Sequence, residues 1–312
     1  MPGLVYMRTY LLPMLLCCSL AAYSQAGTPR APQQERGVVA VIPFQWYGHH
    51  LVIPALVSGT ADTLHFIFDT GTEVTVLHYG LMEKLRIQGR KKAAMSATNN
   101  QALKVSTATL NALHLDQARL PFLKVYLENI PEFRKGPVPI DGFIGVDLLK
   151  AYIVKIDYAQ QQLVLYRPGA EVPAAAQRIP FRLSFRTPVI TASIQLPGGG
   201  SLTSNYLLTT GGDYGILFNW PYTKKHRLDQ QLVTTGTDKV LDLFKELEYI
   251  NSSIPAMHIG SLQLRQVPVS YCQDVNDDSP LMEIAGAAGY EIWKQCSSVI
   301  IDYAGKMLYL QQ

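Results

Sequence analysis

Short apolar segments with alternating side chains recur along most of the chain. Two clear examples are Leu51 to Val57 and Val189 to Leu196, which are rich in Val, Ile and Leu. Gly and Pro interrupt such segments about every ten residues, as turn residues do between strands. The stretches Val146 to Ala151 and Tyr290 to Lys294 are expected to be short helices. The pattern therefore predicts a mostly β protein with few helices.

The order of these segments in the first half of the chain is repeated in the second half. The matching features are Ile42-Pro43-Phe44 with Ile179-Pro180-Phe181, the turn Phe68 to Gly71 with Leu208 to Gly211, Asp141 to Gly145 with Ala285 to Gly289, and the closing hairpins Ile153 to Tyr166 and Val299 to Leu310. From Asp69 to Gly145 is 76 positions (145 − 69), and from Thr209 to Gly289 is 80 (289 − 209). We therefore predict a duplication, with similar domains at residues 38–166 and 179–312. A linker at 167–178, rich in Pro and Ala, would join them.

The start of the chain resembles an export signal. Arg8 precedes the apolar stretch Tyr10 to Ala22, and small residues suited to cleavage follow up to Ala26. We predict a signal peptide at residues 1–26 and an exported protein, in the periplasm, the cell envelope or outside the cell. A retained membrane anchor is the alternative, but Pro13 interrupts the stretch, which is shorter than the roughly 20 apolar residues that span a bilayer. No stable membrane span is expected after cleavage.

Four cysteines bear on the export prediction. Cys17 and Cys18 lie in the signal, where the bulky Leu16 disfavours lipid attachment. Cleavage leaves Cys272 and Cys296 in the mature chain. In an oxidising compartment these two either pair as a disulfide or stay separate as buried thiols, and the sequence leaves both alternatives open.

The composition argues against two classes of protein. The 312 residues are 48% hydrophobic and 16% charged, so the chain can bury a core and lies outside the range of disordered proteins. The formal net charge is only +3, and Arg90-Lys91-Lys92 is the longest basic run. The charge pattern therefore gives little electrostatic support for nucleic-acid binding, and we expect no nucleic-acid partner.

Candidate chemistry begins at the end of one apolar strand. Leu64 to Phe68 is followed directly by Asp69-Thr70-Gly71, which puts a carboxylate in a turn where Gly71 permits close approach of the backbone. Taken alone, the tripeptide fits a structural turn as well as a catalytic one. Its surroundings decide between the two.

With Ile67-Phe68 before it and Phe143-Ile144-Gly145-Val146-Asp147-Leu148-Leu149 downstream, this turn resembles the retropepsin-like and pepsin-like aspartic peptidases. The resemblance covers about Val38 to Gln312 and places a flap hairpin around Met95 to Leu110. It implies a two-lobed acid-protease fold, in which duplicated retropepsin-like β-barrel units surround a central cleft.

The resemblance also implies a mechanism. Members of the family use two aspartates, one from each lobe or subunit, which share a proton because two adjacent like charges cannot both ionise. One carboxylate activates water, and the other, protonated, polarises the scissile carbonyl. Asp69 would be one of the pair. Thr70 would brace the turn by hydrogen bonding across to Thr210.

The second turn, Thr209-Thr210-Gly211, departs from the family pattern. Thr209 stands where the second aspartate is expected, and a hydroxyl group cannot share a proton in the way that a carboxylate can. A substitute acid would come from Asp213, four positions further on, or from Asp69 of a second molecule in a homodimer.

Other chemistries have less support in the sequence. The chain has no Gly-x-Ser-x-Gly nucleophile elbow, no His-Glu-x-x-His zinc motif and no Walker-type phosphate loop. His49 and His50 suggest a metal site, but neighbouring residues in a strand point to opposite faces. Gly198-Gly199-Gly200 corresponds to a hairpin turn in the first half. No metal or other cofactor is expected.

Three functions follow from these observations. The first is an aspartic-type endopeptidase that acts on extended peptide or protein substrates, with Asp69 as the catalytic acid/base. The second is a non-catalytic pseudo-peptidase that binds peptides, because Thr209 replaces the second aspartate. The third is an exported β protein without a cleft function.

Overall fold

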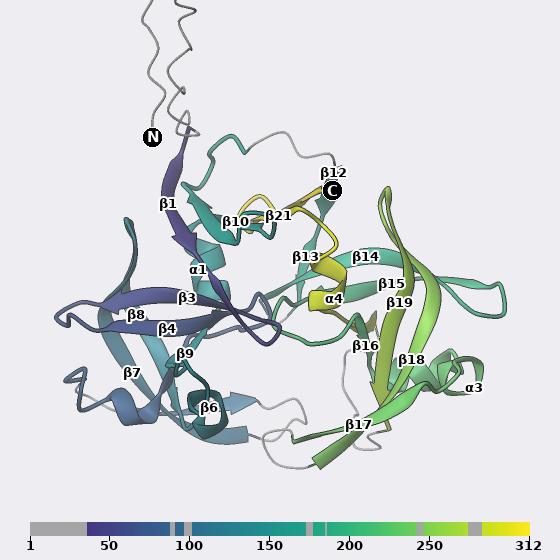
Figure 1. Cartoon of the computed structure of the whole chain (residues 1–312), viewed down its shortest axis with the longest axis horizontal. Helices are drawn as coiled ribbons and strands as arrows, with labels where there is room; N and C mark the ends of the chain where they lie inside the picture. Colours follow the sequence, from purple (N-terminus) through teal and green to yellow (C-terminus); the bar gives the residue numbers. More distant parts are fainter. Residues whose placement is uncertain are drawn as a thin grey trace, which may run out of the picture. The chain divides into compact units, whose positions relative to one another are not determined.

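The computed structural model describes residues 36–87, 91–96, 102–172, 177–184, 186–241, 246–273 and 283–312. The signal peptide predicted for residues 1–26 lies outside them, so export stays a prediction. In the described part of the chain, strands β1 to β22 make up most of the structure, with four short α-helices and two 3-10 turns. The prediction of a mostly β protein is confirmed (Figure 1).

One eight-stranded sheet is built from the first half of the chain. Its strands are β2 (Gln45–Tyr47), β3 (His50–Val57), β4 (Thr63–Phe68), β5 (Val76–His78), β6 (Lys91–Ser96), β7 (Ala102–Leu115), β8 (Ala118–Glu128) and β9 (Gly142–Ile144). Their spatial order is β2-β3-β4-β9-β5-β8-β7-β6, with a further β3–β7 pairing. Strand β4 runs parallel to β9, and helix α1 (Val146–Ala151) follows β9. This parallel pair puts the end of β4 beside the start of α1.

A second eight-stranded sheet is built from the second half. Its strands are β13 (Arg182–Ser184), β14 (Thr187–Gln195), β15 (Ser201–Leu208), β16 (Ile216–Phe218), β17 (Gly236–Leu241), β18 (Glu246–Ile259), β19 (Leu262–Cys272) and β20 (Ile284–Ala288). The order β13-β14-β15-β20-β16-β19-β18-β17, with a further β14–β18 pairing, corresponds position by position to the first sheet. Helices α2 (Trp220–Lys225) and α3 (Leu228–Gln231) follow β16, and α4 (Tyr290–Trp293) follows β20.

Both halves contribute to a third sheet of six strands. Its order is β1 (Val38–Pro43), β11 (Gln162–Tyr166), β10 (Ile153–Asp157), β21 (Ser298–Asp302), β22 (Met307–Gln311) and β12 (Gln177–Pro180). The halves join where β10 pairs antiparallel with β21, from Val154↔Ile301 to Asp157↔Ser298. Gln177 and Arg178, assigned to the linker from sequence, belong to β12. The connecting segment therefore ends earlier than the sequence indicated, and β12 returns along β22.

The hydrophobic core runs without a break through the three sheets. It includes Phe66 and Phe68 of the first half, Tyr206 of the second half and Ile156 of the shared sheet. Trp293 is completely buried and donates its indole N–H to the carbonyl oxygen of Ala288 at 2.8 Å. The core therefore holds β4 and β15 in place, the strands that lead into the turns Asp69-Thr70-Gly71 and Thr209-Thr210-Gly211.

Two remaining sequence questions concern the cysteines and the membrane. Cys272 and Cys296 are both thiols, and burial raises the pKa of the Cys296 thiol to about 11. The structure has no disulfide bond between these two cysteines, which favours the separate-thiol alternative. Within the described ranges, we find no helix with the length and apolar character required to traverse a bilayer.

Candidate active site

The turn at Asp69 is held in place by the strand beside it. The Asp69 amide donates to the Ile144 carbonyl oxygen at 3.0 Å, and the Thr72 amide donates to the Asp69 carbonyl oxygen at 3.0 Å. A Cβ atom at Gly145 would lie 1.9 Å from that same carbonyl oxygen. The downstream glycine of the sequence motif is therefore needed for the close approach of β9 to the turn.

One oxygen of Asp69 receives hydrogen bonds from both halves of the chain. Oδ1 accepts from Thr209 Oγ1 at 2.8 Å, from the Gly71 amide at 2.9 Å, from the Gly211 amide at 2.9 Å and from the Thr210 amide at 3.1 Å. Oδ2 accepts from Thr72 Oγ1 at 3.3 Å. Because donors surround Oδ1, any proton on this carboxyl group would reside on Oδ2.

A second set of contacts ties the two turns together below the carboxylate. The Thr70 amide donates to Thr210 Oγ1 at 3.2 Å, and Thr70 Oγ1 donates to the Leu208 carbonyl oxygen at 3.0 Å. Both threonines are buried. The expected link from Thr70 to Thr210 is present, but it uses the backbone amide of Thr70, whose hydroxyl group reaches Leu208 instead.

Neither proposed source supplies a second carboxylate at Asp69 in this structure. The Asp213 carboxylate lies 2.9 Å from Nδ1 of His49 and is 60% exposed. Thr209 of the same chain already fills the position against Asp69 that another molecule would have to occupy. A homodimer completed through this face would therefore have to displace the second half of its own chain.

The expectation that His49 and His50 point apart is wrong. Their ring centroids lie only 4.0 Å apart. The reason is local: His49 belongs to a turn, in which Gly48 has a φ of +61°, so the alternation of a regular strand begins only at His50. In the described residues, however, no group of three or more His, Cys, Asp and Glu side chains is arranged to hold a metal ion.

Two basic side chains link the halves at corresponding places, a feature that the sequence analysis missed. His49 precedes β3 and faces Asp213, whereas Arg186 precedes β14 and lies 3.7 Å from Asp147 of α1. Burial lowers the pKa of His49, although Asp213 and Glu291 act to raise it. The matching positions before β3 and β14 were the only signal in the sequence that pairs these residues.

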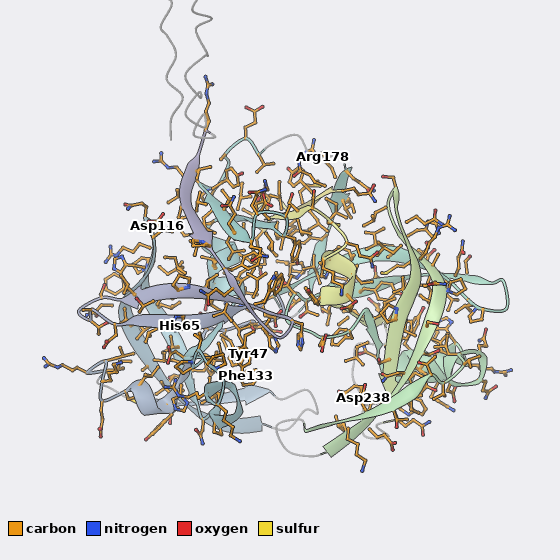
Figure 2. The ribbon with its side chains drawn as sticks, in the orientation of Figure 1. Tyr47, His65, Asp116, Phe133, Arg178 and Asp238 are labelled. Carbon is orange, nitrogen blue, oxygen red and sulfur yellow. The ribbon has the colours of Figure 1, made fainter. Side chains whose placement is uncertain are left out.

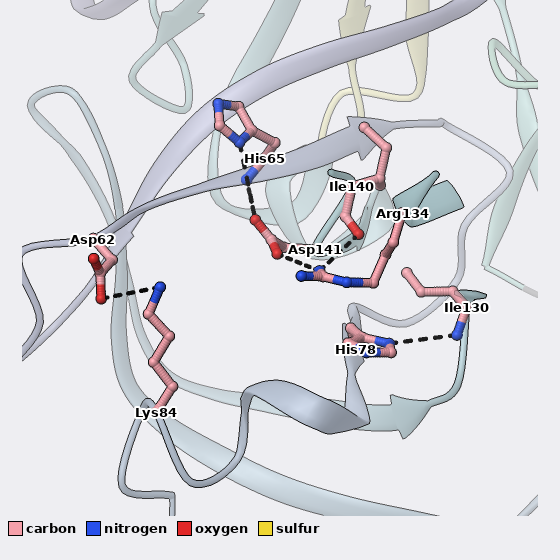
Figure 3. Close-up of polar contacts among 8 residues, drawn as sticks. All are labelled: Asp62, His65, His78, Lys84, Ile130, Arg134, Ile140 and Asp141. Atoms are coloured by element: carbon pink, nitrogen blue, oxygen red, sulfur yellow. Dashed lines mark hydrogen bonds and ion pairs between the residues drawn. The ribbon is translucent and has the colours of Figure 1, made fainter. Parts of the chain in front are cut away.

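A buried ion pair holds a loop against the first sheet (Figure 3). Asp141 is 5% exposed, and its Oδ1 lies 2.6 Å from Nη1 of Arg134 in the 3-10 turn η2 (Pro131–Arg134). Its Oδ2 accepts from the His65 amide at 2.9 Å. The neighbouring Phe133 ring lies 5.8 Å from the ring of His50. Asp141 thereby fixes the loop that carries an aromatic side chain toward the candidate site.

Apolar packing supports the same loop from the other side. Tyr47 and Phe133, labelled in Figure 2, pack against a small buried cluster of Val52, Ile67 and Ile140. These five side chains come from β2, β3, β4 and the loop before β9. The wall beside His50 is therefore built by the first half alone.

The second half contributes the phenol side chain of Tyr214 to the surroundings of Asp69. Burial raises the pKa of Tyr214 well above its ordinary value, and the negative charge of Asp69 raises it further. Its ring passes so close to Gly212 and Gly289 that a Cβ atom would lie 2.4 Å from the ring at Gly212 and 2.6 Å from it at Gly289. Tyr214 therefore stays neutral, and no pattern in the sequence singled it out.

The flap predicted around Met95 to Leu110 corresponds to the hairpin of β6 and β7. The two strands pair in antiparallel register from Lys91↔Thr107 to Ser96↔Ala102. Residues 97–101, between them, lie outside the described residues. The matching hairpin in the second half is β17 with β18.

Gly211→Ala is expected to disrupt the site. A Cβ atom at this position would lie 2.6 Å from Cγ of Asp69, so the two turns would have to separate. We expect a loss of about 1–3 kcal/mol in the free energy of unfolding, measured in urea. Gly198→Ala, which places its Cβ in open space, is the matched control and should change it by less than about 0.5 kcal/mol. Equal stability of the two variants would contradict the close contact.

Comparison with known proteins bears on the first half. Residues 53–148 match the family model described as Aspartyl protease. The match begins within β3 and contains β4, the Asp69 turn, β9 and the start of α1. A search of curated proteins found no match.

Proposed function

Because residues 53–148 form an aspartyl-protease family domain, we propose that the protein is an aspartic-type peptidase that works with one carboxylate, Asp69. The observation that carries the proposal is the set of hydrogen bonds at Oδ1, three of whose four donors come from the turn of the second half. This arrangement orients the carboxylate and leaves Oδ2 with one hydrogen bond among the described residues, from Thr72. A positioned carboxylate oxygen of this kind suits a general base.

The proposed reaction is hydrolysis of an extended peptide. Oδ2 of Asp69 removes a proton from water as the water oxygen attacks the scissile carbonyl carbon. The same proton then passes to the leaving nitrogen as the C–N bond breaks, which returns Asp69 to its carboxylate form. Thr209 holds Oδ1 by donating its hydroxyl hydrogen at 2.8 Å, and it takes no part in proton transfer.

We further propose that the chain has the two-lobed acid-protease arrangement, with duplicated units at residues 38–166 and 179–312. The support is the identical strand order of the two eight-stranded sheets and the meeting of their glycine turns. In this arrangement the substrate would lie in a cleft between the units, beneath the hairpins β6–β7 and β17–β18.

A peptide-binding protein without catalysis is the second candidate. It is favoured by Thr209, since the family mechanism requires an acid at that position. Strands β6 and β17 are the last strands in their sheet orders, so either could pair with an added peptide strand. The two candidates differ in whether a bound peptide is cut.

Asp69→Asn is the direct test of the peptidase. The mature protein should cleave a mixture of unfolded proteins at about pH 5, and the substitution should reduce the rate by about 10²–10⁴-fold because an amide cannot act as the base. The asparagine side chain can still accept the hydrogen bonds now made to Oδ1, so the unfolding transition should change little. Fragments would be quantified by mass spectrometry. Equal cleavage by the two proteins would rule out Asp69 as the catalytic base.

A further inference from the structure

The register of the first sheet places His50 beside Asp69. Strands β3 and β4 pair antiparallel with Leu51↔Phe68 and Val52↔Ile67. Continuing this register by one step sets His50 opposite Asp69. Directly opposed residues share a face, with Cβ atoms about 4.5–5.5 Å apart. The imidazole ring therefore belongs to the surroundings of the carboxylate.

The second half has no equivalent group. There β14 and β15 pair with Val189↔Leu207, and two further steps set Thr187 opposite Thr209. Thr187 is buried, and its hydroxyl group does not titrate. The histidine and the aspartate are thus found together in one half, facing two threonines in the other.

The Nδ1 atom of His50 is buried and has no hydrogen-bond partner among the described residues. Leaving a buried polar atom without a hydrogen-bond partner is unfavourable. The protein neighbours of the ring are aromatic, with the His49 centroid at 4.0 Å and the Phe133 centroid at 5.8 Å. With no partner for this nitrogen in the described part of the chain, a water molecule or a substrate group is the candidate partner.

Burial keeps the ring of His50 neutral at mildly acidic pH. Burial and then His49 lower the pKa of His50 to about 4, against the opposing effects of Asp69 and Asp213. A neutral imidazole has one nitrogen that accepts a hydrogen bond and one that donates. Near pH 5 the ring can therefore accept a hydrogen bond from water.

We propose that His50 is a second catalytic residue, which accepts a hydrogen bond from the attacking water and holds that water against Oδ2 of Asp69. The water donates one hydrogen to His50 and the other to Asp69. As the water oxygen bonds to the scissile carbon, Asp69 takes the second proton and later delivers it to the leaving nitrogen, while His50 undergoes no net change. This role rests on the proposed peptidase function.

The test compares His50→Ala and His50→Gln with wild type at pH 5, on the same peptide substrate. We expect kcat to fall by about 10²–10³-fold in His50→Ala, within the range for a positioned acid or base, while KM changes by less than about threefold. Added imidazole should restore part of the lost kcat in His50→Ala. His258→Gln, a histidine substitution on β18, is the matched control and should leave kcat unchanged.

The outcomes separate this inference from the proposed function. If His50→Ala keeps the wild-type kcat while Asp69→Asn is inactive, the role of His50 is wrong and the peptidase stands. A fall in kcat that imidazole does not restore, with a parallel rise in KM, would make His50 structural only. If wild type itself cuts nothing, both proposals fail. If circular dichroism shows that His50→Ala does not fold, kcat and KM are measured for His50→Gln and compared with those of wild type instead.

Discussion

Thr209→Asp is expected to raise kcat/KM for peptide cleavage by about 10²–10⁴-fold at pH 4–5, the range contributed by one positioned general acid. The Thr209 hydroxyl group lies 2.8 Å from Oδ1 of Asp69, so a carboxylate there would adjoin the first one. Two carboxylates at this distance share a proton, because both cannot ionise together. The protonated member would then polarise the scissile carbonyl, which the threonine does not do.

The pH profile and a neutral variant make this experiment specific. Activity of Thr209→Asp should decline as pH rises and the shared proton is lost, and kcat/KM would be measured from pH 3 to 7. Thr209→Asn has a similar shape without an acid and should show no gain. If wild type is inactive and Thr209→Asp is active, the natural protein is the peptide-binding candidate. If Thr209→Asp shows no gain over wild type, the missing acid is not what limits the site.

Asp141→Ala is expected to lower the free energy of unfolding by about 3–5 kcal/mol, as measured by urea denaturation. The substitution removes the carboxylate that accepts from the Arg134 guanidinium group and from the His65 amide, and it leaves the guanidinium group with the Ile140 carbonyl oxygen at 3.2 Å (Figure 3). Removing one partner of a buried ion pair has this cost because the other charge stays desolvated.

The same figure contains the matched control for this prediction. Asp62 and Lys84 form an ion pair at 3.3 Å, with side chains that are 50% and 53% exposed. Asp62→Ala should therefore cost no more than about 1 kcal/mol. If the two variants are equally stable, the pair of Asp141 with Arg134 is not effectively buried and does not hold the loop.

The sequence was sufficient for the parts of the fold that depend on local patterns. Alternating apolar residues predicted the strands, and helix α1 has the predicted bounds Val146–Ala151. The turn at Asp69 also meets the turn at Thr209, as the predicted correspondence between the two halves of the chain requires. The contacts between Thr209 and Asp69 follow from that correspondence.

The sequence was not sufficient for contacts that depend on long-range register. The juxtaposition of His50 with Asp69 requires the pairing of β3 with β4, and the stacking of His49 on His50 requires a turn that an alternating pattern does not reveal. The buried pair of Asp141 with Arg134 depends on the path of a loop. Both residues are charged, and charged side chains are seldom fully buried, so the sequence offered no sign of this pair.

The shared six-stranded sheet limits how the molecule can admit a polypeptide. Backbone hydrogen bonds between β10 and β21 fasten the halves along a seam, so they cannot swing apart on residues 167–176 as two bodies on a tether would. In the proposed cleft, access to Asp69 would then depend on the hairpins β6–β7 and β17–β18 and not on separation of the two halves. The rates at which a peptide binds and leaves would be set by these hairpins.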